Sequence, residues 1–260
     1  MANVFGRGII TILIERSITI RSFITDRRVH PRYERERQPA DGAEYLPTDR
    51  CGDRREEVLT VAVTFFENPE GTREEILAAT YRALCDHGYS ELTISRIGEE
   101  FEKSPSLVYH HYESKDELVL ECLEFMLEGF EEQMTDDIDE PRARLEEFFE
   151  WGLEADIKDD RKRFIVLLVE LRSLASRNDA YRRHFTRSDR VFEQYLARVI
   201  ESGIDGEVFN DCDPDRVATW VLTTLSGVML RRSTQDHDPA WLKDVRTEID
   251  AYLEARVYRE

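Results

Sequence analysis

Lysine is scarce in this sequence: 5 of its 260 residues are lysine, against 31 arginines and 55 acidic residues. The formal net charge is −19 at pH 7, which is the wrong sign for attracting a polyanion over a distance. A strongly acidic, lysine-poor surface is typical of proteins that work in concentrated salt. We therefore predict a halophilic protein, with an ordinary acidic protein as the alternative.

Paired cysteines and long apolar runs are also missing. The cysteines lie far apart and form no CxxC pair; they are Cys51, Cys85, Cys122 and Cys212. This spacing disfavours a disulfide framework or a zinc site, and four thiols fit a reducing cytosol. The apolar run at residues 8–14 is too short to span a bilayer, and charged residues follow it, unlike a signal peptide. We expect a cytoplasmic protein that does not enter a membrane.

No strand pattern and no internal repeat is present, whereas apolar residues recur at helical spacing from residue 72 onward. An all-α fold is therefore predicted. A phosphate-binding loop, a nucleophile elbow and a cofactor fingerprint are missing too. His110 and His111 would point about 100° apart on a helix, so they do not chelate one metal together. These absences argue against an enzyme, and we predict neither a cofactor nor a metal.

Three helix starts are crowded into residues 93–115. Each has a capping side chain or a proline at the first helical position: Thr93 for the first helix, Ser104 and Pro105 for the second, and Ser114 with Glu117 for the third. Starts this close together allow only short helices, which need packing from the helices on either side. Helix-turn-helix DNA readers have this layout, and their second helix enters the major groove.

The same region resembles the TetR/AcrR family of transcriptional regulators. The match runs over residues 72–118 and agrees in order, spacing and capping at Thr93, Ile97, Ser104, Leu107, Val108, Tyr109, Tyr112, Ser114, Lys115, Asp116, Glu117 and Leu118. The resemblance implies a ligand-responsive repressor that acts as a homodimer on a palindromic operator. The alternative is a helical sensor or interaction protein that kept the fold without binding DNA. The acidic helix-turn-helix region leaves that alternative open.

The resemblance also implies how the chain is divided. Residues 65–118 would form an N-terminal helix-turn-helix DNA-binding domain, and residues 119–260 a C-terminal helical bundle for effector binding and dimerisation. The dimer would form through the last two helices, near 214–232 and 239–257. Cap signals further predict a capping box at Thr72 and a helix over about 179–202 that ends at Gly203. The last two helices should each start with an aspartate cap followed by proline, at Asp213 and Asp238.

Residues 1–64 differ from the rest in charge: they hold 11 basic and 10 acidic residues, against 25 and 45 in the remainder. Their mixed charge and low apolar content predict disorder. We favour the interpretation that this extension is non-native because the start codon is placed too early, with the native chain beginning near Val61 or Val63. The alternative is a basic arm that follows a DNA minor groove.

Candidate DNA contacts gather at the starts of the short helices: Thr93, Lys103, Ser104, Pro105, Ser106, Tyr109, His110, Tyr112 and Lys115. By resemblance, Tyr109 and Lys115 contact phosphates. Ser106 and His110 would share the exposed face of the second helix and meet base edges. Tyr112 is also expected in the core, together with Ile97, Phe101 and either Leu107 or Val108. For each contact the alternative is a solvated face or a plain cap.

An effector pocket would lie inside the helices between Phe125 and Leu225. Its candidate lining residues are Trp151, Glu170, Arg172, Tyr195 and Trp220, although aromatic residues on helices are more often core. Residues 71–118 hold 5 basic and 10 acidic residues. Binding driven by phosphate neutralisation weakens as salt rises, so we predict that specific DNA binding by this acidic region depends only weakly on salt.

Overall fold

The computed structural model describes residues 66, 68–101, 106–134, 138–235 and 240–259. The predictions for residues 1–64, for Lys103, Ser104 and Pro105, and for a helix start at 238–239 lie outside the described residues. Every named element is an α-helix, which confirms the predicted all-α fold. None of the described helices is both long and apolar enough to cross a membrane.

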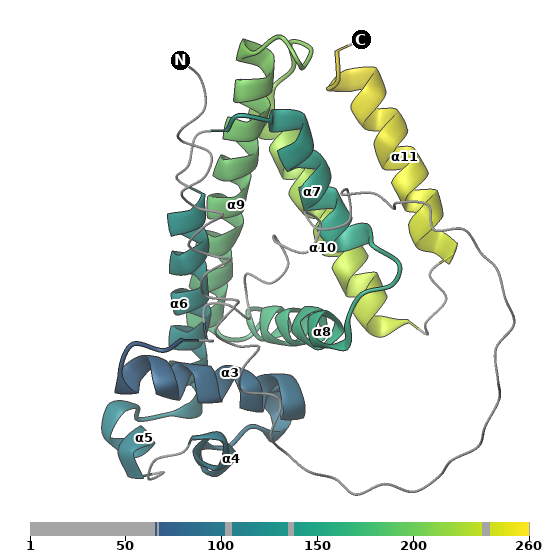
Figure 1. Ribbon diagram of the computed structural model, residues 1–260. Coiled ribbons are helices and arrows are strands. Elements are labelled where there is room, and N and C mark those ends of the chain that lie inside the picture. The colour runs from purple at the N-terminus through teal and green to yellow at the C-terminus, as the bar shows by residue number, and fades with distance from the viewer. Residues whose placement is uncertain (1–65, 67, 102–105, 135–137, 236–239, 260) are drawn as a thin grey trace, which may run out of the picture. The chain divides into compact units, whose positions relative to one another are not determined.

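The first four helices carry the helix-turn-helix. They are α3 (Thr72–Glu91), α4 (Ile94–Glu100), α5 (Ser106–His111) and α6 (Lys115–Gln133), and in Figure 1 the first three lie together at the start of α6. The regular conformation of α3 is interrupted at Gly88, whose φ of 70° is in the left-handed region that favours glycine. The last residues of α3 therefore leave the helix axis and lead into α4.

Five further helices follow: α7 (Pro141–Leu153), α8 (Asp159–Leu174), α9 (Asp179–Asp205), α10 (Pro214–Thr234) and α11 (Ala240–Arg256). The long helix α9 packs against α10, α7, α6 and α8. Figure 1 shows α9 running beside α6 at one end and beside α10 at the other. Helix α9 therefore packs both against helices that precede it in the chain and against the helix that follows it.

Three predicted helix caps are confirmed. The side chains of Thr93, Ser114 and Asp213 each accept a hydrogen bond from the backbone N–H three residues further on, at 3.2, 3.1 and 3.1 Å. Two other cap predictions were wrong. Thr72 is already inside α3, whose N-cap is Gly71 without a side-chain bond. Gly203 does not end α9, which continues to Asp205.

Buried apolar side chains form two cores. The first core joins α3, α4, α5 and α6 to α8 and to the start of α9; its members from the last two helices are Phe164, Leu167, Leu171, Tyr181 and Phe185. The second core joins α7, the second half of α9, α10, α11 and the C-terminal segment; its fully buried members include Leu145, Phe149, Leu196, Ile200, Phe209 and Val217. The short DNA-reading helices therefore share their core with α8.

Candidate DNA interface and effector pockets

Helix α5 has one buried face and one exposed face. Val108 is fully buried and packs in the first core with Ile97 and Phe101, while its neighbour Leu107 is only half-buried. On the opposite side Ser106, Tyr109 and His110 are exposed, and Tyr109, at 64% exposed, is an unusually open large aromatic residue. A short helix anchored by Val108 thus presents a hydroxyl, a phenol and an imidazole on one surface.

Two other candidate contacts are less available. Tyr112 is only 4% exposed and packs in the first core, so its side chain offers almost no surface to DNA. Thr93 is exposed, but its hydroxyl oxygen already accepts the N–H of Arg96 at 3.2 Å. A threonine hydroxyl can still donate its own hydrogen. Thr93 therefore keeps one donor, whereas Tyr112 serves the core.

Lys115, at the first turn of α6, is held by Tyr89 from the end of α3. Its ammonium donates to the Tyr89 carbonyl oxygen at 3.1 Å and lies 4.1 Å from the centre of the Tyr89 ring. The Tyr89 hydroxyl donates a short hydrogen bond to the Asp116 carboxylate. Burial, followed by this hydrogen bond, raises the pKa of Tyr89 to about 12. The Lys115 ammonium is thus held at the start of α6 by the carbonyl oxygen and the ring of Tyr89.

The arginines of α3 and α4 are engaged in ion pairs with carboxylates of the same region. The pairs are Arg73 with Glu121 at 2.6 Å, Arg82 with Glu100 at 3.6 Å and Arg96 with Glu91 at 2.9 Å. These side chains cannot bind phosphates without giving up a partner. The described part of the helix-turn-helix therefore lacks the open basic surface that most DNA readers use.

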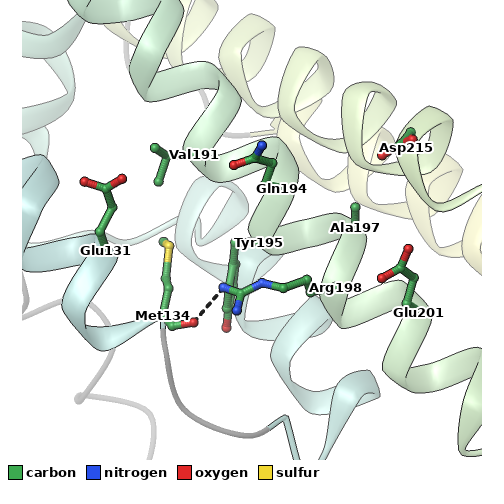
Figure 2. Close-up of a pocket in the computed structure, with 9 residues that line it drawn as sticks. All are labelled: Glu131, Met134, Val191, Gln194, Tyr195, Ala197, Arg198, Glu201 and Asp215. Atoms are coloured by element: carbon green, nitrogen blue, oxygen red, sulfur yellow. Dashed lines mark hydrogen bonds between the residues drawn. The ribbon is translucent and has the colours of Figure 1, made fainter.

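The effector candidates do not share one cavity. Tyr195 lines an open pocket of about 530 Å³ between the end of α6, α9 and the start of α10 (Figure 2). Glu170 lines a smaller pocket of about 220 Å³ between α3 and α8. Trp151 packs beside the guanidinium of Arg161, 5.6 Å from the ring centre. Trp220 stacks on Tyr252 in the second core, with ring centres 3.8 Å apart.

The larger pocket is acidic. Figure 2 shows Glu131 of α6 and Met134, the residue after this helix, opposite the α9 residues, with Arg198 donating to the Met134 carbonyl oxygen at 2.7 Å. Its other lining residues are Val191, Gln194, Tyr195, Ala197, Glu201 and Asp215. Glu131 is paired with Arg187 of α9, so the negative charge of the lining comes from Glu201 and Asp215 against Arg198. Tyr195 adds an aromatic ring, whose centre lies 5.9 Å from the Arg198 guanidinium.

The helices predicted to form the dimer leave an uncharged stripe exposed on α10. Thr219, Thr223, Gly227 and Leu230 are all exposed and follow helical spacing along one face. Leu230 is 53% exposed, and a Cβ atom added at Gly227 would meet nothing within 4 Å. Such a stripe is unusual in a chain with 35% charged residues.

The contact of Glu170 with the end of α3 could not be predicted from the sequence. The Glu170 carboxylate accepts the N–H groups of Tyr89 and Ser90, at 2.9 and 3.2 Å. Arg172, the other polar candidate on α8, forms an ion pair with Asp189 of α9. The only local signal was Gly88, whose positive φ directs the two N–H groups away from the helical ladder and toward α8.

Two regions of the chain match models of known protein families. Residues 76–122 match the model of bacterial regulatory proteins of the tetR family, and residues 141–257 match the C-terminal model of BetI-type transcriptional repressors. The crystal structure of a TetR transcription regulator from Haloarcula marismortui is 34% identical with a TM-score of 0.61, covering 71% of this chain and 97% of that one.

Two curated relatives point in the same direction. The HTH-type transcriptional repressor AcnR of Corynebacterium diphtheriae is 25% identical over 166 residues, which cover 61% of this chain and 80% of AcnR. An uncharacterised HTH-type transcriptional regulator of Mycobacterium bovis is 26% identical over 189 residues, or 70% of this chain and 87% of that protein.

Proposed function

Since the chain belongs to the TetR family of transcriptional regulators, we propose that it is a homodimeric repressor that a small-molecule effector releases from a palindromic operator. The observation that carries the proposal is the exposed face of α5, where Ser106, Tyr109 and His110 stand opposite the buried Val108. A DNA-binding regulator works where the chromosome is, so we propose a cytoplasmic protein. No enzymatic activity is proposed.

In this proposal Tyr109 and Lys115 contact phosphates, and Ser106 and His110 meet base edges in the major groove. Thr93 would add a backbone contact, and Lys103, Ser104 and Pro105, which lie outside the described residues, are proposed as further contacts from the sequence alone. Tyr112 is left out because its side chain is buried. On the open face of α5, Ser106 and His110 are four residues apart and would reach the bases. Tyr109 of α5 and Lys115 at the start of α6 would reach the sugar-phosphate backbone.

Salt dependence follows from the paired arginines of α3 and α4. Few cations are available to displace counterions from DNA, so specific affinity would come mainly from base contacts and close fit. We therefore propose a shallow loss of affinity as KCl rises, which suits a protein adapted to concentrated salt. A steep loss between low and molar KCl would contradict both parts of this proposal.

The first test is fluorescence anisotropy with the DNA upstream of the gene, at several KCl concentrations up to molar. We expect the wild type to bind tightly. His110→Ala should lose about 1–3 kcal/mol of binding free energy, because His110 is proposed to contact a base. Tyr109→Ala and Lys115→Ala should weaken binding to all sequences alike. Arg190→Ala, at an exposed arginine of α9 outside the helices proposed for DNA contact and for the dimer, is the control and should bind as the wild type does.

A negative result in this experiment has a definite meaning. If the wild type binds neither the upstream DNA nor any duplex selected from a random pool, the helical sensor alternative is favoured. The acidic composition of residues 71–118 is the feature that favours it, with 5 basic and 10 acidic residues.

Dimerisation is proposed to use the exposed stripe of α10, together with α11. Small residues at the middle of the stripe allow two helices to approach closely, and Leu230 supplies an apolar contact. We expect Leu230→Glu to yield a monomer in sedimentation equilibrium and to lose operator binding, because one reader covers only one half-site. Val208→Glu, at an exposed apolar residue outside both helices, should remain dimeric.

For the effector we propose a small organic cation bound in the pocket of about 530 Å³, which is within the usual size range of ligand sites. The carboxylates of Glu201 and Asp215 and the Tyr195 ring suit a positive charge. Cations should raise the melting temperature of the wild type and lower its operator affinity, and should do neither in Glu201→Gln or Tyr195→Ala. A stabilising anion of similar size would contradict the assignment.

A further inference from the structure

The Glu170 carboxylate of α8 contacts the end of α3, beside an ion pair between Arg163 of α8 and Asp86 of α3 at 3.5 Å. The Glu170 Oε2 atom accepts the Tyr89 N–H at 2.9 Å, and Oε1 accepts the Ser90 N–H at 3.2 Å. Gly88 makes this possible in two ways. Its φ of 70° turns the two N–H groups toward α8, and a Cβ atom at this residue would lie 3.1 Å from Oε2. The carboxylate thus fixes the backbone on either side of the Tyr89 side chain.

Tyr89 in turn fixes the start of α6. Its carbonyl oxygen and its ring both face the Lys115 ammonium, at 3.1 and 4.1 Å, and its hydroxyl donates to Asp116. The Tyr89 ring also lies edge-on to Tyr181 of α9, with ring centres 6.1 Å apart. Four helices therefore meet at one tyrosine, which holds both Lys115 and Asp116 at the start of α6.

We propose that Glu170 and Tyr89 are positioning residues that hold Lys115 where it can contact a DNA phosphate. We call this link from α8 through Tyr89 to Lys115 the relay, and we call the DNA-binding helices α3–α5 with the start of α6 the reader. The proposal rests on the proposed function. A lysine ammonium has three N–H donors. One is taken by the Tyr89 carbonyl, and the others remain to bind a phosphate. A lysine held in this way loses less side-chain freedom when DNA binds than one that is unrestrained.

The relay gives α8 influence over DNA affinity without any contact between α8 and DNA. Phe164, Leu167 and Leu171 of α8 belong to the first core, so α8 and the reader are held together by apolar packing as well as by Glu170. A displacement of α8 along its axis would withdraw the carboxylate from Tyr89 and release Lys115. An effector that moves α8 would then weaken binding by loosening one cation in each reader.

A plain structural role for Glu170 predicts something different. If the carboxylate only satisfies two N–H groups at the end of α3, its removal lowers stability and leaves the effect of Lys115 on DNA affinity unchanged. A double-mutant cycle separates the two roles, because residues that act through one another give non-additive losses. Glu170→Ala removes both acceptors, and Glu170→Gln keeps one and is the conservative variant.

The experiment uses the full-length protein and a duplex selected by the wild type from a random pool, well below the melting temperature of every variant. Glu170→Ala should weaken binding about fivefold for each reader, the cost of ordering one long side chain. Glu170→Gln should recover part of that loss. In a Lys115→Ala background, Glu170→Ala should cause no further loss. Additive losses would overturn the relay alone, and an empty selection would overturn both the relay and the proposed function.

A second readout needs no DNA. The chain has only 5 lysines, so a spectrum of protein labelled with ¹³C at the lysine ε-carbon contains few signals. The signal absent from Lys115→Ala identifies Lys115, and the Tyr89 ring should shift it upfield. We expect Glu170→Ala to return this signal to the position of an unrestrained lysine. An unchanged signal would show that Glu170 does not position Lys115.

Discussion

The two cores differ in what they enclose and in how their helices are joined. The first core contains the short DNA-reading helices together with α8, and the polar contacts of Glu170, Tyr89 and Lys115 lie at its edge. The second core contains the helices proposed to form the dimer, and aromatic pairs such as Trp220 on Tyr252 pack against it. The reader is therefore inseparable from α8, and a movement between the cores would have to be accommodated along α9.

The largest expected effect on stability comes from truncating a fully buried leucine in either core. Leu171→Ala in the first core and Leu196→Ala in the second should each cost about 2–5 kcal/mol of unfolding free energy, measured by urea titration. Hydrogen exchange then shows whether each variant loosens only its own core. Leu171→Ala should increase exchange in α3–α6, whereas Leu196→Ala should increase it in α10 and leave the reader protected. Equal loosening of both regions by either variant would show that the cores are not separate units.

The sequence predicted the helices well and their packing poorly. Local signals placed the caps at Thr93, Ser114 and Asp213, because a cap depends on residues three positions apart. The assignment of α8 to the core of the reader depends on contacts between residues far apart in the chain. Periodicity shows that Leu171 is buried, but it does not say against which helix.

The candidate site shows the same limit. The exposure of Tyr109 and the burial of Val108 follow from helical spacing, and the structure resolves the choice between Leu107 and Val108 in favour of Val108. Glu170 was expected to line an effector pocket. Its contacts with Tyr89 and Ser90 depend on the φ of Gly88 and on the position of a helix some 80 residues further along the chain. No short-range pattern carries that information.

The second-largest effect should come from Gly203, which the sequence suggested as a helix end. A Cβ atom there would overlap the ring of Phe209, which is itself buried in the second core. Gly203→Ala should therefore cost about 1–3 kcal/mol through overpacking, although alanine normally favours a helix. Glu201→Ala, on the exposed face of the same helix, is the control. A Gly203→Ala protein as stable as the wild type would show that Phe209 can move aside.

Two arginines around the second core should differ in how much they contribute to the stability of the protein. Arg232 is half-buried and donates to the carbonyl oxygens of Gly152, Glu154 and Ala155 at the end of α7, at 3.2, 2.6 and 3.2 Å. Arg232→Ala leaves these acceptors without a partner and should cost about 1–2 kcal/mol in chemical denaturation. Arg216, whose side chain is 82% exposed, pairs with Asp213, and Arg216→Ala should change stability by less than about 0.5 kcal/mol.

The smallest effect concerns His184, at the contact of α9 with α6 beside the first core. Its side chain is 8% exposed, and its Nδ1 lies 3.1 Å from a Glu124 carboxylate oxygen. Burial, followed by the positive charge of Arg172, lowers the pKa of His184, while Asp189 opposes the shift. Glu124 is itself paired with Arg187, which limits its attraction for a proton on the ring.

Because the pKa of His184 is lower in the folded protein than in the unfolded chain, the unfolded chain takes up the proton first as pH falls. The stability due to the neutral ring is complete above about pH 6.5 and is lost progressively below it. Between about pH 7.5 and 5.5 the wild type should therefore lose more melting temperature than His184→Gln, while exposed His87→Gln should follow the wild type. A greater loss in His184→Gln would mean that Glu124 outweighs burial and keeps the ring charged.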